Sequence, residues 1–144
     1  MYIFRADAVL KYNLLFDTYT ITTDEFKEQY QLANDEQKVK LNIDKWFDML
    51  NNRDYENAFN YLDETFRTDN LKNDPSVFES YMREKYPLHY QVLYGNIIER
   101  NGTYAQSIKL KDITGEDTTE YLLDIVMELK DDMNFVMSFT MQSK

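Results

Sequence analysis

The apolar positions between residues 34 and 52 follow the 3.6-residue period of an α-helix. They are Val39, Ile43, Trp46, Phe47 and Leu50, at offsets 0, 4, 7, 8 and 11 from the first. This spacing gathers the apolar side chains in one stripe, and the positions between them are mostly polar or charged. The pattern predicts an amphipathic helix that needs a large apolar surface to lie on, with the single tryptophan in the middle of its stripe.

Helical spacing recurs on both sides of this segment. Short amphipathic helices are predicted over residues 1–16, 24–32, 55–66 and 75–86, with a polar loop over residues 68–74. Asp54 has the position of an N-cap, and Asp74-Pro75 combines a capping acid with a proline at the first helical position. Pro87 ends the last helix, because its ring and its missing N–H prevent continuation.

From residue 88 the period of the apolar positions changes to two, which is the repeat of a β-strand. Asn101-Gly102 separates two such runs, residues 89–99 and 104–111, and is the residue pair most typical of a two-residue hairpin turn. Two more strands are predicted over residues 121–129 and 135–142. Helices that precede four antiparallel strands predict an α+β fold, with the N-terminal helices packed on a curved four-stranded antiparallel sheet.

The hairpin turn also predicts which side chains share a face of the sheet. With Asn101-Gly102 as the loop, Arg100 pairs with Thr103, and uninterrupted alternation assigns the remaining residues. The face away from the helices then carries Tyr90, Val92, Tyr94, Ile98, Leu122, Val126 and Val136. A sheet face exposed to water should be more polar, so either residues 1–33 cover it or a protein partner does.

Length and apolar pattern together predict the domain organisation. Residues 1–33 are expected to form an N-terminal helical arm, and residues 34–144 a single α+β domain. No apolar run approaches the roughly 20 residues that a membrane-spanning helix needs, and the first residues lack the features of a signal peptide. A membrane anchor outside this segment stays open, as does the choice between the cytoplasm and the extracytoplasmic face of a bacterial membrane.

Composition narrows the function classes further. The formal net charge is −10, and the acidic residues are spread along the chain. Because phosphate backbones are bound by clustered lysine and arginine, this charge argues against a nucleic-acid partner and leaves a basic protein or a cation as candidates. The chain has no cysteine, which excludes disulfides, thiolate metal sites and a cysteine nucleophile.

The order and spacing of these elements resemble the nuclear transport factor 2-like group of the cystatin-like superfamily. The resemblance rests on Trp46-Phe47, on Asp54-Tyr55-x-x-Ala58-Phe59-x-x-Leu62, on Phe66, on Phe78-x-x-Tyr81 and on the four closing strands. It implies a curved sheet that wraps a long helix and leaves a cone between them. The chain is also similar to extracytoplasmic assembly domains of type IV secretion and conjugation machines. Residues 1–33 would then lead from a membrane anchor.

The resemblance implies that a pocket in the cone is one place for chemistry. Enzymes of the superfamily place a histidine, aspartate or tyrosine there, and the predicted register turns His89, the only histidine, toward it. The other pocket candidates are Tyr104, Gln106, Tyr61 and Tyr81. The alternative is an inert histidine at a strand end. No base with an orienting partner can be identified from spacing, so we assign no catalytic residue and no cofactor.

The acidic loop over residues 112–120 is a candidate calcium site, because calcium prefers oxygen ligands. The spacing of an EF-hand loop is absent, and a solvated hairpin loop explains the composition, so we assign no metal.

The leading hypothesis is a non-enzymatic protein-interaction or assembly domain, of a bacterial cell-envelope complex, that binds a protein partner or a second copy through its outer sheet face. One alternative is a small-ligand carrier or enzyme that uses the cone pocket. Another is an acidic inhibitor or immunity-type protein that neutralises a basic partner.

Overall fold

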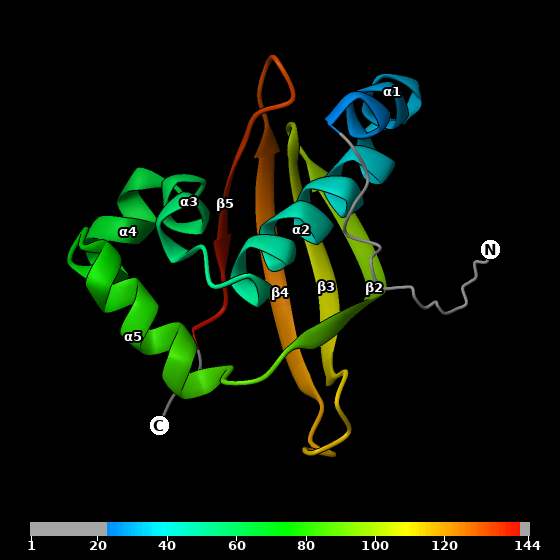
Figure 1. The fold of residues 1–144 in the computed structure, drawn as a ribbon. Helices are drawn as coiled ribbons and strands as arrows, with labels where there is room; N and C mark the ends of the chain where they lie inside the picture. Colours follow the sequence, from blue (N-terminus) through cyan, green and yellow to red (C-terminus); the bar gives the residue numbers. More distant parts are fainter. Residues whose placement is uncertain (1–22, 142–144) are drawn as a thin grey trace. The chain divides into compact units, whose positions relative to one another are not determined.

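The computed structural model describes residues 23–141 (Figure 1). The chain divides into two compact units, residues 1–33 and 34–144. Helix α1 (Thr23–Leu32) belongs to the first unit and agrees with the helix predicted over residues 24–32. The helix predicted over residues 1–16 and the predicted end of the last strand at Gln142 lie outside the described residues.

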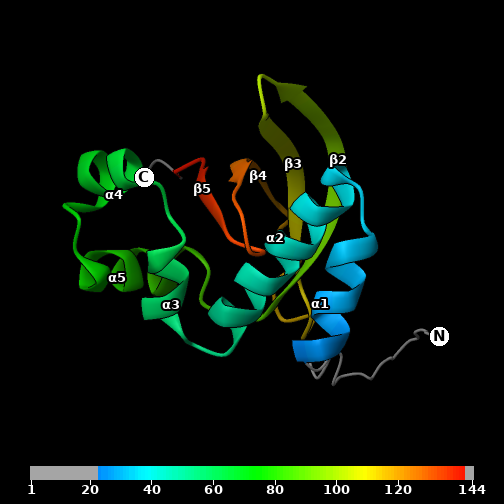
Figure 2. The ribbon, with the colours of Figure 1, turned by 90° about the horizontal axis from the view of Figure 1, so that it is seen from above.

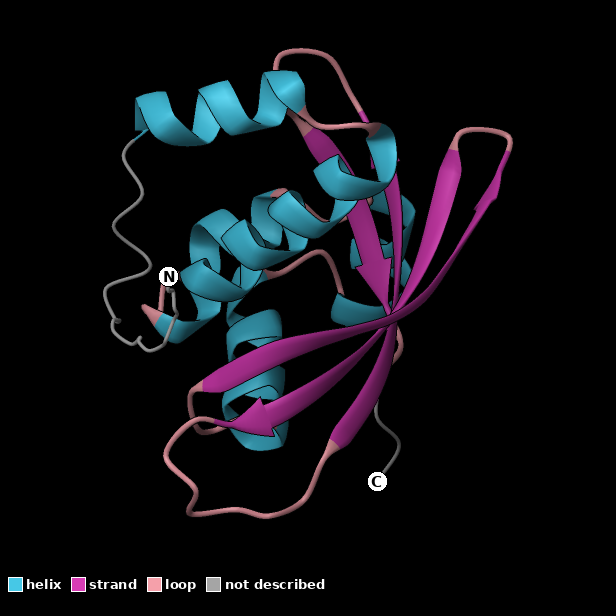
Figure 3. Ribbon diagram, turned by 90° about the vertical axis from the view of Figure 1, so that its right-hand side faces the viewer, coloured by secondary structure: helices cyan, strands magenta, loops and turns pink. Residues whose placement is uncertain are grey.

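The second unit has α+β architecture, in which helices precede and pack against an antiparallel sheet of four strands in the order β2-β3-β4-β5. Its elements are α2 (Asp35–Asn51), α3 (Tyr55–Asn60), α4 (Glu64–Leu71), α5 (Pro75–Lys85), β2 (Tyr90–Arg100), β3 (Thr103–Asp112), β4 (Tyr121–Leu129) and β5 (Phe135–Phe139). Helix α2 lies along one face of the sheet, which we call the inner face, and α3, α4 and α5 gather beside β5 (Figures 1 and 2). The sheet is strongly twisted (Figure 3).

Helix α2 forms where its sequence predicts it. Asn34 caps the helix, and its side chain and that of Gln37 exchange hydrogen bonds with each other's backbone N–H at 2.9 Å. The predicted apolar stripe is buried, and Trp46 retains 1% exposure. The Trp46 indole N–H donates to the carbonyl oxygen of Ala58 at 2.8 Å, so the only polar atom of this side chain is satisfied inside the core.

The single helix predicted over residues 55–66 is wrong, because the chain breaks it into α3 and α4. Between them Leu62 forms a parallel bridge to Met137 at the edge of the sheet. The Met137 N–H donates to Tyr61 O at 3.0 Å, and the Asp63 N–H donates to Met137 O at 2.8 Å. Asp63 then caps α4, which extends through most of the segment predicted as a polar loop. The break therefore protects the outer edge of β5.

The hairpin turn is confirmed, since Arg100 pairs with Thr103 and both turn residues have positive φ, 53° at Asn101 and 83° at Gly102. Farther along, however, the predicted alternation in β2 is wrong. Tyr94 pairs with Ile108 and Ile97 with Gln106, so one extra residue lies in β2 between these pairs. This β-bulge exchanges the faces for the first half of the strand.

As a consequence, Tyr90, Val92 and Tyr94 lie on the inner face and not on the outer face where alternation placed them. Tyr90 is buried, and Val92 and Tyr94 pack against the core. Leu93, in contrast, lies on the outer face and is exposed. The four remaining outer-face residues, Ile98, Leu122, Val126 and Val136, have the predicted orientation.

Candidate functional site

The residues predicted to line a pocket in the cone lie in separate parts of the fold. His89 is exposed at the start of β2, and its carbonyl oxygen accepts a hydrogen bond from the Ile113 N–H at 2.9 Å. Tyr104 is buried, and its hydroxyl donates to the Asp35 carboxylate at 3.0 Å, beside the N-terminus of α2. These two residues therefore lie at opposite ends of the sheet, and the predicted orientation of His89 toward the cone is wrong because His89 is exposed.

Gln106 is fully buried, but its side-chain N–H group is hydrogen-bonded to backbone carbonyl groups of the bulge. Its side-chain N–H group lies 3.0 Å from the carbonyl oxygen of Gly95 and 3.2 Å from that of Asn96. The bulge removes these carbonyl groups from the regular ladder, and a buried carbonyl without a donor is costly. Gln106 is thus a structural residue of the bulge.

Tyr61 and Tyr81 lie near β5, away from the other candidates. The Tyr61 ring stacks on Phe135 with 4.4 Å between centroids, and the Tyr81 ring lies 6.2 Å from that of Phe139. The space between α2 and the sheet is filled by aromatic side chains, with Trp46 packed against Phe139 at 5.7 Å. The structure does not bring the five pocket candidates together.

The acidic loop after β3 is held by its own hydrogen bonds. The Asp112 carboxylate accepts from the Thr114 N–H at 2.9 Å, the Thr114 hydroxyl at 2.8 Å and the Asp117 N–H at 2.9 Å. Burial by itself raises the pKa of Asp112, but these hydrogen bonds lower it below its ordinary value. Across residues 23–141, no group of three or more histidine and acidic side chains is arranged to hold a metal ion.

The outer face of the sheet presents large apolar side chains to solvent. The exposed fractions are 70% for Leu122, 58% for Ile98, 40% for Val126 and 39% for Leu93. Ile98, Ala105 and Val126 are direct neighbours across β2, β3 and β4, so they form a continuous apolar row. Val136 is diagonal to Val126 on β5 and extends this row.

The charges on the outer face are balanced, unlike those of the chain. The strands present three basic side chains, Arg100, Lys109 and Lys111, against two acidic ones, Asp124 and Glu128. This gives a local charge of +1 on a chain with a net charge of −10. Lys109 pairs with Glu120 and Glu128 pairs with Lys130, each at 3.3 Å, and adding one acid and one base leaves this charge unchanged. Acidic residues are therefore not in excess on the face where the apolar side chains are exposed.

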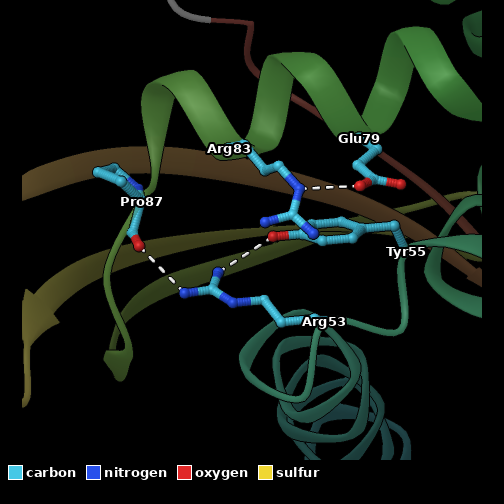
Figure 4. Close-up of polar contacts among 5 residues, drawn as sticks. All are labelled: Arg53, Tyr55, Glu79, Arg83 and Pro87. Carbon is cyan, nitrogen blue, oxygen red and sulfur yellow. Dashed lines mark hydrogen bonds and ion pairs between the residues drawn. The ribbon is translucent and has the colours of Figure 1, made fainter.

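A second feature, which the sequence pattern did not indicate, lies where the end of α2 meets α5 and the start of β2 (Figure 4). The Asn51 side chain exchanges two hydrogen bonds of 3.2 Å with the backbone of Tyr90. Beside this contact is a recess of about 10 Å³, roughly the space of one water molecule, lined in part by Arg53, Tyr55 and Tyr90. Its residues come from separate elements, so no sequence spacing connects them.

No family model matches this chain, and neither a curated protein nor a solved structure matches it. Among the helices of residues 23–141, none combines the length and the apolar character needed to cross a membrane.

Proposed function

We propose that this chain is a protein-interaction domain that associates with a second copy of itself through the outer face of its sheet. The observation that carries this proposal is the exposure of Leu93, Ile98, Leu122 and Val126 on that face. Burial of these side chains against another sheet would remove apolar surface from water, which drives most protein association.

The balance of charge favours a second copy as the partner. Two chains of net charge −10 repel each other over most of their surfaces, but the outer faces carry +1 each. Lys109 and Lys111 lie toward the Asp112 end of β3, whereas Asp124 and Glu128 on β4 pair with Ser107 and Thr103, toward the hairpin end of β3. A two-fold axis that lies in the plane of the face and runs across the strands would place the basic end of one copy against the acidic end of the other.

The area of the outer face sets the expected strength of dimerisation. Neighbouring strands lie about 4.8 Å apart and rise about 3.3 Å per residue, so the outer face of this four-stranded sheet has an area of roughly 500 Å². A standard interface buries about 800 Å² per partner, so we expect a weak dimer that forms with rising concentration. The setting in a bacterial envelope complex is supported by the resemblance in element order alone.

The test is sedimentation velocity on the whole chain from about 10 μM to about 1 mM, the range of weak association. Val126→Asp is expected to weaken dimerisation at least about tenfold, because the dimer would bury an unpaired charge. The matched control is Ile113→Asp, which changes an exposed apolar residue in the loop after β3, outside the proposed interface. A wild-type chain that stays monomeric over the whole range, or equal effects of the two variants, would contradict the proposal.

A further inference from the structure

The second feature of the structure begins with an unusual backbone position at Arg53. This residue follows Asn52, the C-cap of α2, and precedes Asp54, the N-cap of α3, with φ of 62°. Glycine or asparagine usually occupies such a left-handed position, because a Cβ atom makes it costly. The side chain is held firmly, since it donates to the Tyr55 hydroxyl at 3.0 Å and to the Pro87 carbonyl oxygen at 3.1 Å.

A second guanidinium reaches the same tyrosine from α5. The Arg83 guanidinium lies 5.0 Å from the centre of the Tyr55 ring, and its Nε–H donates to Glu79 at 2.8 Å. Figure 4 shows Arg53 at the hydroxyl end of Tyr55 and Arg83 against its ring. Glu79 lies on the side of Arg83 away from Arg53 (Figure 4), and the two guanidiniums with this one carboxylate carry a charge of +1.

Both guanidiniums retain donor capacity. A guanidinium carries five N–H donors. Among the described residues, Arg53 uses two of these for Tyr55 and Pro87, and Arg83 uses one for Glu79. The remaining donors of both arginines are available to an acceptor from outside the chain.

The adjacent recess supplies a further donor. Tyr90 is 4% exposed and lines the recess, and its hydroxyl proton has no acceptor among the described residues. A buried hydroxyl normally finds a partner. The recess has room for about one oxygen atom, and its other walls include the apolar side chains of Leu50 and Met82.

We propose that Arg53, Arg83 and Tyr90 form a binding site for a carboxylate group. One carboxylate oxygen enters the recess and accepts the Tyr90 hydroxyl proton, while the other lies against the guanidiniums, which match the planar shape of a carboxylate. The recess is too small for more than this oxygen, so the remainder of the ligand lies outside. The site shares no residue with the outer face of the sheet and does not depend on dimerisation.

The charges of the site favour a carboxylate over a phosphate. Glu79 is paired with Arg83, and the carboxylates of Asp112 and Asp117 act on Tyr90, so a dianion would be repelled more strongly than a monoanion. A tetrahedral phosphate would also leave several oxygens outside a recess that accepts one.

The test is NMR titration of the whole chain with sodium acetate, against sodium chloride at equal ionic strength. The expected result is saturable shifts of the Arg53 and Arg83 Nε–H signals and of the Tyr90 amide. Arg53→Lys keeps the charge but loses the planar donor pair, and should weaken acetate binding at least about tenfold. Arg100→Lys, in the hairpin, is the matched control and should leave binding unchanged.

Tyr90→Phe is the second variant, because it keeps the ring in the core and removes only the hydroxyl. It should weaken acetate binding while the spectrum of the free protein stays folded. Absence of saturable shifts in the wild-type chain, equal binding by Arg53→Lys and the wild type, or tighter binding of phosphate than of acetate at matched ionic strength would each overturn the proposal.

Two peptides distinguish the sources of the carboxylate. Acetyl-Ala-Ala with a free C-terminus is compared with the same peptide amidated. Binding of the free acid alone, more tightly than acetate, assigns the site to a peptide C-terminus, and equal binding of the free acid and acetate assigns it to small carboxylic acids. Binding of the amidated peptide as tightly as the free acid would overturn the assignment.

Discussion

At the scale of single residues, the contact between α2 and β2 depends on acidic side chains. The Tyr94 hydroxyl donates to the Asp44 carboxylate and lies 2.9 Å from the Lys40 carbonyl oxygen. Asp48 lies one turn farther along α2, in a last turn that has no basic residue. Burial raises the pKa of Asp48 to about 7, and the negative charge of Asp44 contributes to the rise. The negative end of the helix dipole opposes an ionised Asp48 as well.

This raised pKa predicts a pH-dependent stability. The pKa of Asp48 is about 7 in the folded chain and near 3.8 when it is unfolded, so the folded chain binds more protons between these values and loses stability as the pH rises from about 4 to about 7. Asp48→Asn should therefore raise the free energy of unfolding above pH 7 by about 1–2 kcal/mol, allowing for partial exposure. Near pH 4 the gain should vanish.

Denaturant unfolding at pH 4 and pH 8 checks this expectation. Glu116→Gln, in the exposed loop after β3, serves as the control. An equal effect of Asp48→Asn at both pH values would show that ionisation of Asp48 has no part in the stability.

At the scale of elements, the bulge in β2 decides which side chains reach the core. It allows Tyr94 to contact α2 and places Tyr90 at the recess, and the Gln106 amide binds the carbonyl groups that the extra residue displaces. Without it, uninterrupted alternation would turn Tyr90, Val92 and Tyr94 to solvent and Leu93 to the core.

The bulge predicts an unusual tolerance to deletion. Removal of Asn96 should convert the bulge to regular pairing and keep Tyr94 opposite Ile108, at a cost of about 1–2 kcal/mol from altered hydrogen bonds to Gln106. The control is deletion of Lys109 in β3, where pairing with both neighbours is regular. That deletion should unfold the chain, because it exchanges the faces of half a central strand.

Circular dichroism and thermal unfolding measure both deletions. If deletion of Asn96 unfolds the chain as completely as deletion of Lys109, the extra residue is needed for more than the register.

At the scale of the whole molecule, net charge governs association. Two chains of −10 repel at long range, and salt screens this repulsion. The Debye length falls from about 30 Å at 0.01 M salt to about 10 Å at 0.1 M. The proposed dimer should therefore strengthen as salt is raised from about 0.01 M to about 0.1 M.

Sedimentation at both ionic strengths measures this dependence, with Ile113→Asp as the reference for a change of charge outside the interface. The alternative function, an acidic protein that neutralises a basic partner, requires the opposite trend, because salt weakens attraction between opposite charges. A dimer that weakens steeply as salt is raised would contradict the claim that acidic and basic charges are balanced on the outer face.

Much of the architecture follows from local pattern. The stripe of α2, the start of α5 at Asp74-Pro75 and the Asn101-Gly102 turn were each predictable, because their causes lie within a few residues of one another. The break between α3 and α4 was not predictable from spacing, because Leu62 leaves the helix for a bridge to Met137, which is distant in the sequence.

The sequence by itself determined the α+β class, the order of helices before strands, and the burial of Trp46, because the period of the apolar positions shows which side of an element is buried. The tertiary structure alone decided the register of the first half of β2, the approach of Arg53 and Arg83 to Tyr55, and the recess beside them that Tyr90 lines. The reason is physical: an extra residue in a strand is stabilised by a side chain of its neighbour, and a site built from separate elements exists only after they have packed.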